Sequence, residues 1–227
     1  MSAADTSLDP GRLRVATTTR RGTFEVTVDL TVEPGELVLL AGPNGSGKTS
    51  LLHTMAGLIA PTTGRITLRT DVLDDAALGL HVPPEHRHMA LVHQQHLLFP
   101  HLSALENAAF GLRARGLAKT EARARGLEWL NRLGLADFAS VRADRLSGGQ
   151  SQRVAIARAL ATSPRALLLD EPLAALDAAV RESVRDVIIG AVRDWGIPAI
   201  LVSHDPAEAS VADRIIRLEG GRMVNGN

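Results

Sequence analysis

Four short apolar runs, each ending in polar residues, constrain the fold of this chain more than any other feature. They are ELVLLAG, MALVH, RALLLDE and PAILVSH, at positions 36–42, 89–93, 165–171 and 198–204. Runs of this kind are typical of strands buried on both faces. The segment between the last two runs has an apolar stripe at helical spacing, formed by Val180, Val184, Val187, Ile188, Ala191 and Trp195. Strands that alternate with helices predict an α/β fold, with a mainly parallel sheet and helices on both faces.

Two further segments differ from these runs. Residues 24–32, FEVTVDLTV, alternate apolar and polar side chains and indicate a half-buried strand. From about residue 97 to 145 the pattern is helical, and Ser103 and Glu106 have the spacing of a capping box. A later helix of this stretch has an apolar stripe made of Leu127, Leu130 and Leu133. We interpret the stretch as a helical insertion.

The composition is that of an ordinary soluble protein, since 45% of the 227 residues are hydrophobic. Lys and Arg number 25 and balance 25 Asp and Glu, so the net charge predicts neither a nucleic-acid partner nor binding to an anionic membrane. The absence of cysteine excludes disulfides and thiolate metal sites. No uninterrupted apolar run approaches the roughly 18–20 residues that span a bilayer, so at a membrane we expect another chain to supply the span.

A glycine-rich segment, GPNGSGKT at 42–49, follows the first apolar run and precedes a helical pattern. It fits the phosphate-binding pattern G-x-x-x-x-G-K-[ST], in which backbone N–H groups converge on an anion at a helix N-terminus. We expect Lys48 to reach the β- and γ-phosphates and Thr49 to bind Mg²⁺, and we expect a side chain at Gly45 or Gly47 to occupy the space that the phosphates need. A chance glycine-rich turn is disfavoured by the flanking strand and helix. The predicted nucleotide-binding residues here are Gly42, Pro43, Asn44, Gly45, Ser46, Gly47, Lys48, Thr49 and Ser50.

Two adjacent acids end the third apolar run. Asp170 is suited to Mg²⁺, and Glu171 is suited to polarising an attacking water. The alternative for Asp170 is that it caps a following helix.

A second glycine pair lies in LSGGQ, at 146–150, before the helical pattern of residues 151–160. Ser147 with two glycines at a helix start predicts a second anion-binding terminus, although Ser147 could also be only an N-cap.

Six motifs in one order resemble those of ATP-binding cassette (ABC) ATPases, and the resemblance covers essentially the whole chain. They are GPNGSGKT as Walker A, VHQ with Gln94 as the Q-loop, LSGGQ as the signature, LLLDEP as Walker B, AALD ending in Asp177 as the D-loop, and VSHD with His204 as the switch histidine. The resemblance implies a P-loop NTPase fold with an antiparallel β N-terminal portion and an inserted α-helical subdomain. It implies one domain over residues 1–227, with a catalytic core at 1–96 and 146–227 and a helical subdomain at about 97–145.

The resemblance also implies roles for the later motifs. Gln94 would contact Mg²⁺ and the attacking water, and His204 would hold the γ-phosphate. Two cassettes would pair head to tail, so that the signature of one chain contacts ATP held by the Walker A of the other. The nucleotide-contacting set implied for this interface is Ser147, Gly148, Gly149, Gln150 and Asp177.

The cofactors implied are ATP and Mg²⁺. The partners implied are a second ATPase subunit, integral membrane permease subunits and, indirectly, an extracytoplasmic solute-binding protein, with no nucleic acid. The chain would lie on the cytoplasmic face of the cell membrane, held by the permease.

The residue that stacks on adenine is left open by the sequence. The chain has no tyrosine, and Phe24, Arg20 or Arg21 could contact the base. Alanine stands at Ala174, where the family often has serine, and we expect activity to survive this change.

LLFPHLSALENAAFGLRARG and DEPLAALD most resemble the ATPases of bacterial binding-protein-dependent importers, particularly those for molybdate and similar oxyanions. Many of those carry a C-terminal regulatory domain, and we expect that this chain lacks one or was shortened. The alternatives are an importer of another small solute, a soluble ABC ATPase of repair or translation, and a small-molecule kinase, which LSGGQ disfavours.

A cluster of histidines made of His81, His86, His88, His93, His96 and His101 could form a zinc or sensor site. No carboxylate or thiol spacing supports a zinc site, so we expect no zinc.

Overall fold

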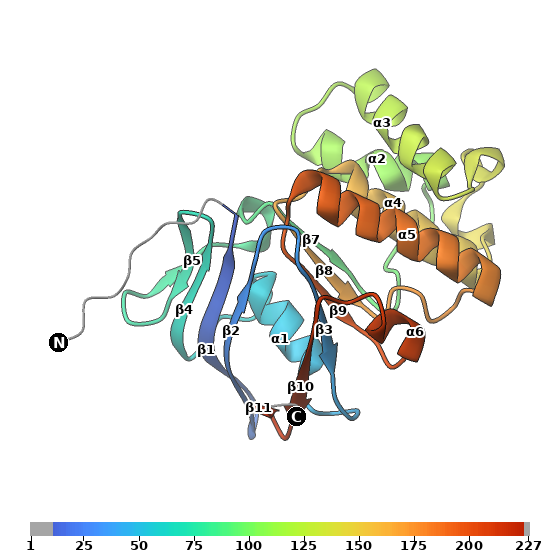
Figure 1. Cartoon of the computed structure of the whole chain (residues 1–227). Coiled ribbons are helices and arrows are strands. Elements are labelled where there is room, and N and C mark those ends of the chain that lie inside the picture. The colour runs from blue at the N-terminus through green and yellow to red at the C-terminus, as the bar shows by residue number, and fades with distance from the viewer. Residues whose placement is uncertain (1–10, 225–227) are drawn as a thin grey trace.

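The structure is a computed structural model that describes residues 11–224, and it confirms the predicted α/β fold (Figure 1). Strands of the described residues form one eleven-stranded sheet in the order β6-β5-β4-β1-β2-β11-β10-β3-β9-β8-β7. The strands are β1 (Leu13–Arg21), β2 (Phe24–Val32), β3 (Leu37–Ala41), β4 (Thr63–Leu68), β5 (Asp71–Asp75), β6 (Leu80–His81), β7 (Met89–Val92), β8 (Ala166–Asp170), β9 (Ala199–Val202), β10 (Arg214–Glu219) and β11 (Arg222–Val224). The helices are α1 (Lys48–Met55), α2 (Ala104–Ala114), α3 (Lys119–Arg132), α4 (Gly148–Ala161), α5 (Ala178–Trp195) and α6 (Pro206–Ala209), with short 3₁₀ segments at Pro84–His86, Ala136–Phe138 and Ala143–Arg145.

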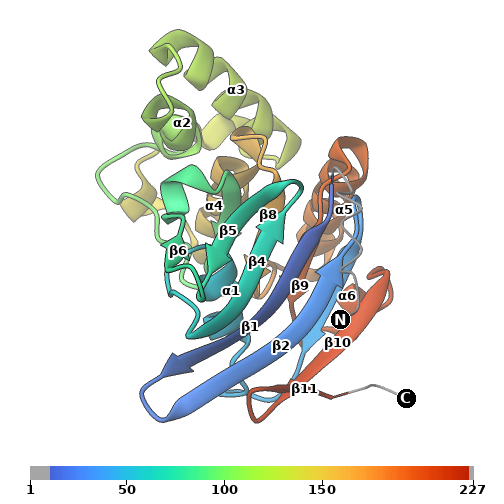
Figure 2. The same ribbon diagram turned by 90° about the vertical axis from the view of Figure 1, so that its left-hand side faces the viewer.

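The sheet has a parallel part and an antiparallel part. Neighbours along β10-β3-β9-β8-β7 are parallel, whereas β1 pairs antiparallel with β2 and β4, and β4 with β5. Figure 2 shows the long strands β1, β2 and β4 side by side on the face turned to the viewer. The predicted parallel centre and antiparallel N-terminal portion are therefore both present.

Helices cover both faces of the parallel strands. Leu37 and Leu39 of β3 pack into a core shared with α4 and α5, whereas Val38 and Leu40 pack into a second core with α1. Burying each such leucine contributes about 1.5–3 kcal/mol relative to leaving it exposed. The alternation explains why this run is continuously apolar.

The prediction that all four apolar runs are buried on both faces is wrong for β7. Met89 and Leu91 are only half-buried, while the residues of β8 and β9 are all buried. Met89 and Leu91 lie on the α1 side of the sheet, and because β7 is the last strand, α1 packs on β8 and covers this face of β7 incompletely.

Helices α2 and α3 fall within the predicted insertion and lie together, away from β4 and β5 (Figure 1). Ser103 caps α2 by accepting a hydrogen bond from the backbone N–H of Glu106. The predicted capping box is wrong in its other half, because the Glu106 carboxylate pairs with Arg113 and Arg123 instead. The division of the chain into a catalytic core and a helical subdomain stays a prediction.

The predicted stripe of α3 is wrong at one position. Leu130 and Leu133 are buried, but Leu127 is 37% exposed. In α5 the predicted stripe faces the core, with Val184, Ile188 and Ala191 buried. No helix within residues 11–224 is long and apolar enough to cross a membrane.

Candidate nucleotide site

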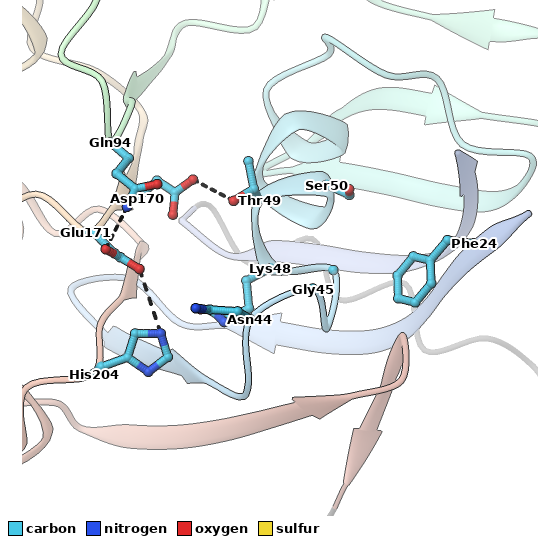
Figure 3. A pocket seen from close by; sticks show the side chains of 11 residues that line it. Phe24, Asn44, Gly45, Lys48, Thr49, Ser50, Gln94, Asp170, Glu171 and His204 are labelled. Atoms are coloured by element: carbon cyan, nitrogen blue, oxygen red, sulfur yellow. Dashed lines mark hydrogen bonds and ion pairs between the residues drawn. The ribbon is translucent and has the colours of Figure 1, made fainter. Parts of the chain in front are cut away.

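The loops that follow four parallel strands converge on one pocket of about 520 Å³. Ligand sites of open α/β sheets lie at the carboxyl ends of the strands, as this one does. Figure 3 shows side chains from these separate loops turned toward one another. The pocket is lined by Phe24, Asn44, Gly45, Gly47, Lys48, Thr49, Ser50, Gln94, Asp170, Glu171 and His204.

Lys48 is the cation of the pocket, at the start of α1. Its Nζ donates hydrogen bonds to the carbonyl oxygens of Gly42 at 2.7 Å and Pro43 at 2.9 Å, so the loop curls around the ammonium group. Burial lowers the pKa of Lys48, and the nearby carboxylates of Glu171 and Asp170 act in the opposite direction. An ammonium group held at a helix N-terminus suits a phosphate chain.

Gly45 has the open environment predicted for it. Its φ is +78°, and a Cβ added there meets no atom within 4 Å. Because Gly45 also lines the pocket, the loop leaves space for phosphates at this position.

Gly47 also lines the pocket, and the prediction that a side chain here would occupy the space of the phosphates stays a prediction. A Cβ added there would lie 2.6 Å from Val26 Cγ2 and 3.1 Å from Phe24 Cε1. Glycine is therefore required because the loop packs against β2, and its φ of +105° also disfavours any side chain.

We predict that Gly47→Ala destabilises the protein more than Gly45→Ala. The backbone strain costs about 1–3 kcal/mol at either position. The contact with Val26 adds roughly 1–3 kcal/mol at Gly47 only. Urea unfolding of the two variants measures the difference, and equal losses would mean that the close packing on β2 is absent.

Two hydrogen bonds organise the acids. Thr49 Oγ1 donates to Asp170 Oδ2 at 2.8 Å, and Gln94 Nε2 donates to Glu171 Oε2 at 2.9 Å. His204 Nε2 lies 3.7 Å from Glu171 Oε1 (Figure 3). Asp170 is the last residue of β8, and the helix that follows, α5, is capped by Asp177, which excludes the alternative that Asp170 serves as its cap.

The donor set fits magnesium. Hydroxyl, carboxylate and amide oxygens of Thr49, Asp170 and Gln94 are hard ligands, and Mg²⁺ is usually bound through few protein ligands together with substrate phosphates and water. This matches a site where a nucleotide supplies the remaining oxygens.

Glu171 has an unusual backbone. Its φ is +49°, which is left-handed and uncommon for a residue other than glycine. Its N–H donates to the carbonyl oxygen of Val202 at 3.1 Å. Conformations of this kind cost about 1–3 kcal/mol and gather at functional sites, where the surrounding structure holds them.

Of the three side chains left open for the adenine base, Phe24 is the one that lines the pocket. It lines the pocket beside the Walker A loop and is 37% exposed. Arg20 is paired with Glu25 at 3.0 Å, so its guanidinium is already engaged. Arg21 lies opposite Phe24 in the β1–β2 register, where β1 ends, and does not line the pocket.

We predict that Phe24→Ala weakens ATP binding about 5- to 150-fold, because stacking of a base on an aromatic ring contributes about 1–3 kcal/mol. Titration with a fluorescent ATP analogue measures the change, and Phe24→Tyr should retain binding. Phe110→Ala removes a ring of similar exposure on α2 and serves as the matched control. Equal affinities of Phe24→Ala and the unmodified chain for ATP would contradict stacking on Phe24 and favour contact of the base with Arg20 or Arg21.

The structure does not bring the signature residues to this pocket. Ser147 caps α4 and forms a full capping box with Gln150. Within one chain, Ser147 therefore serves as an N-cap, as the alternative interpretation predicted. Ser147 and Gly148 are exposed. Asp177 caps α5 by accepting a hydrogen bond from the N–H of Val180 at 3.0 Å. Nucleotide contacts by Ser147, Gly148, Gly149, Gln150 and Asp177 therefore stay predictions that need a second chain.

The histidines of the predicted cluster have separate environments. His81 hydrogen-bonds to Asp74 at 2.6 Å, and the rings of His53 and His93 meet edge to face at 5.3 Å between centroids. Within residues 11–224 no group of three or more His, Cys, Asp or Glu side chains is arranged to hold a metal ion.

Sequence reasoning missed two residues that touch the loops of the site. Gln152 is 1% exposed and bonds to the backbone of Glu171 and Ala175. Arg181 pairs with Asp205 at 2.7 Å, next to His204. A lone glutamine or arginine in a helix carries no signal in a single sequence, so neither was predictable.

The fold and the pocket define a P-loop nucleotide-binding domain with an added helical segment. A sequence profile described as ABC transporter matches residues 26–174, and the chain belongs to this family. It carries the ABC ATPase domain, whose ligands are ATP and Mg²⁺.

The chain is similar to curated importer subunits. It is 41% identical over 218 residues to the molybdenum import ATP-binding protein ModC of Mycobacterium tuberculosis (strain ATCC 25618 / H37Rv), covering 94% of this chain and 58% of that protein. It is 43% identical over 228 residues to the Fe(3+) ions import ATP-binding protein FbpC of Brucella abortus (strain 2308), covering 98% of this chain and 63% of that protein. The chain therefore spans less than two thirds of the length of these relatives.

A solved structure has the same fold. The dimeric post-hydrolysis state of the ATP-binding cassette MJ0796 bound to ADP and Pi superposes with a TM-score of 0.83 at 33% identity, covering 94% of this chain and 97% of that one. The similarity extends over nearly the whole of both chains.

Proposed function

We propose that this chain is the ATP-hydrolysing subunit that energises a membrane importer. The observation that carries the proposal is the single pocket in which Lys48, Asp170, Gln94, Glu171 and His204 meet. The curated relatives named as import ATP-binding proteins support the transport role.

The chain's own residues would act as follows. Lys48 and the backbone N–H groups of the loop bind the phosphates, and Phe24 carries the base. Glu171 accepts a proton from the attacking water, while Gln94 holds its Oε2 by a 2.9 Å hydrogen bond. His204, close to Glu171 Oε1, would donate to the γ-phosphate. Thr49, Asp170 and Gln94 would hold Mg²⁺, which would supply positive charge to neutralise the phosphates.

A second copy would complete the site. The exposed start of α4 presents Ser147 and Gly148 away from the chain's own pocket, and helix N-termini of this kind bind anions. The similarity to a dimeric cassette supports a head-to-tail pair in which each signature reaches the other chain's ATP. Permease subunits would hold this pair at the cytoplasmic face of the membrane, with a solute-binding protein outside.

For the cargo we propose molybdate or a similar oxyanion, and the similarity to a molybdenum import ATP-binding protein supports this choice. A second candidate is ferric ion, because the similarity to FbpC is equally extensive. A third is a phosphonate, since the chain is 45% identical over 200 residues to a putative 2-aminoethylphosphonate import ATP-binding protein, PhnT, of Salmonella typhimurium, covering 87% of this chain and 52% of that protein.

The test is to purify the tagged chain from gently solubilised native membranes and to identify its partners by mass spectrometry. We expect a polytopic permease, after which uptake of molybdate, ferric ion and 2-aminoethylphosphonate is measured with and without the chain. Loss of molybdate uptake alone supports the oxyanion assignment. Recovery with ribosomes or DNA-repair factors instead would replace the transport role by that of a non-transport ABC ATPase.

A further inference from the structure

We propose that Gln152 is a positioning residue for hydrolysis: its side chain holds Glu171 in place and ties it to the start of the signature helix α4. The proposal rests on the proposed role of Glu171 as the residue that polarises water.

Gln152 makes a two-point clamp between α4 and the segment after β8. Its Nε2 donates to the carbonyl oxygen of Glu171 at 3.0 Å, and its Oε1 accepts from the N–H of Ala175 at 2.9 Å. The side chain is 1% exposed, so water does not compete for either bond. One carboxamide therefore fixes both ends of the segment 171–175.

Glu171 needs such support because its backbone is in an unfavourable conformation. With φ at +49°, it depends on bonds to its own N–H and carbonyl groups. Val202 accepts from the N–H, and Gln152 donates to the carbonyl. If the second bond were lost, the peptide after Glu171 could rotate and carry the carboxylate away from Gln94.

The same turn of α4 packs directly on this segment. A Cβ added at Gly149 would lie 3.2 Å from the carbonyl oxygen of Ala175 and 3.3 Å from Leu176 Cδ2. A displacement of the signature turn would therefore be passed to residues 174–176, and through Gln152 to Glu171. In a head-to-tail dimer, the signature of one chain contacts the ATP of its partner. This contact would thus help to position the Glu171 carboxylate in the chain that carries the signature.

The test uses Gln152→Met, which keeps the length and approximate volume of the side chain but removes both hydrogen bonds. We expect kcat to fall about 10- to 100-fold while KM for ATP stays within about twofold, because an interaction needed for chemistry and not for binding has been lost. Gln152→Asn keeps a carboxamide but is one methylene too short to reach both partners, so it gives the same pattern if Gln152→Met does not fold.

Asn107→Leu is the matched control. Asn107 is a fully buried carboxamide that bonds to the backbone of Phe99, far along the chain from Glu171. We expect it to lower the thermal unfolding midpoint as Gln152→Met does but to leave kcat of the isolated chain within about twofold. Equal losses of kcat in the two variants would overturn the positioning role, because general destabilisation would then explain both.

A second readout separates the positioning of Glu171 from support of the signature helix. In a Glu171→Gln background, adding Gln152→Met should leave ATP-driven dimerisation intact. Loss of that dimer would overturn the proposal, since Gln152 would then shape the signature itself. Unchanged kcat in Gln152→Met, with Glu171→Gln inactive, would also overturn it. Full turnover in Glu171→Gln would instead contradict the proposed function.

Discussion

Lys48→Ala is expected to lower ATP turnover at least about 100-fold and to weaken ATP binding. Removing one preorganised charged donor from developing phosphate charge typically costs a factor of 10²–10³ in rate. Lys48 is only 7% exposed, and its two hydrogen bonds to the loop carbonyls show that the ammonium group already points into the curl of the loop. Phosphate release and equilibrium binding of labelled ATP measure the two effects separately.

Lys119→Ala is the matched control for this prediction. Lys119 is the only other lysine of the chain and is exposed at the start of α3. It should retain full turnover, so that a loss in Lys48→Ala reports on the site and not on lysine content. Unchanged ATP turnover in Lys48→Ala would contradict the prediction that residues 42–49 form the phosphate-binding loop.

Glu171→Gln should lose hydrolysis by about 10²–10⁴-fold and keep ATP binding. An amide cannot accept the proton of the attacking water, and general-base catalysis contributes about this factor. The amide is nearly the same shape as the carboxylate, so Lys48, Thr49 and Asp170 remain in place to bind nucleotide. Because ATP is bound and not consumed, the head-to-tail dimer should accumulate.

Size-exclusion chromatography with and without ATP checks this expectation. The matched control is Glu182→Gln, which changes an exposed acid on α5 and should hydrolyse ATP at the normal rate. A Glu171→Gln variant that binds ATP but stays a monomer at all concentrations would argue against the assigned role of Glu171.

Much of the fold was predictable because its signals are local. The strands β2, β3, β8 and β9 and the helix after the glycine-rich loop follow from apolar spacing alone. The half-exposed face of β7 was not predictable, because it depends on which strand ends the sheet, and strand order is set by long-range pairing. The role of Glu106 was not predictable for a similar reason. Its carboxylate pairs with arginines of α2 and α3 and does not complete the capping box of α2.

The candidate site likewise has residues that the sequence predicted and residues that it did not. The pattern around Lys48 predicted a phosphate loop, and the structure places that loop beside Asp170 and Glu171. A further reason for glycine at position 47, the close contact that a Cβ would make with Val26, was not predictable, because the loop sequence does not reveal that β2 packs against it. Gln152 was missed for a related reason: its partners are backbone atoms 19 and 23 residues away.

The absence of cysteine allows the account to be tested by cross-linking, since introduced thiols are then the only ones. In the proposed dimer, one chain's pocket is completed by the signature of a second chain. Two exposed positions outside the proposed machinery mark the two halves: Thr23 beside Phe24, and Arg145 before the signature.

The measurement mixes Thr23→Cys and Arg145→Cys chains, both in the Glu171→Gln background, and adds a short bifunctional maleimide. We predict a cross-linked heterodimer that forms with ATP and Mg²⁺, and that is weak without nucleotide. The same yield with and without ATP, or no cross-link while the chains bind ATP, would contradict the shared site.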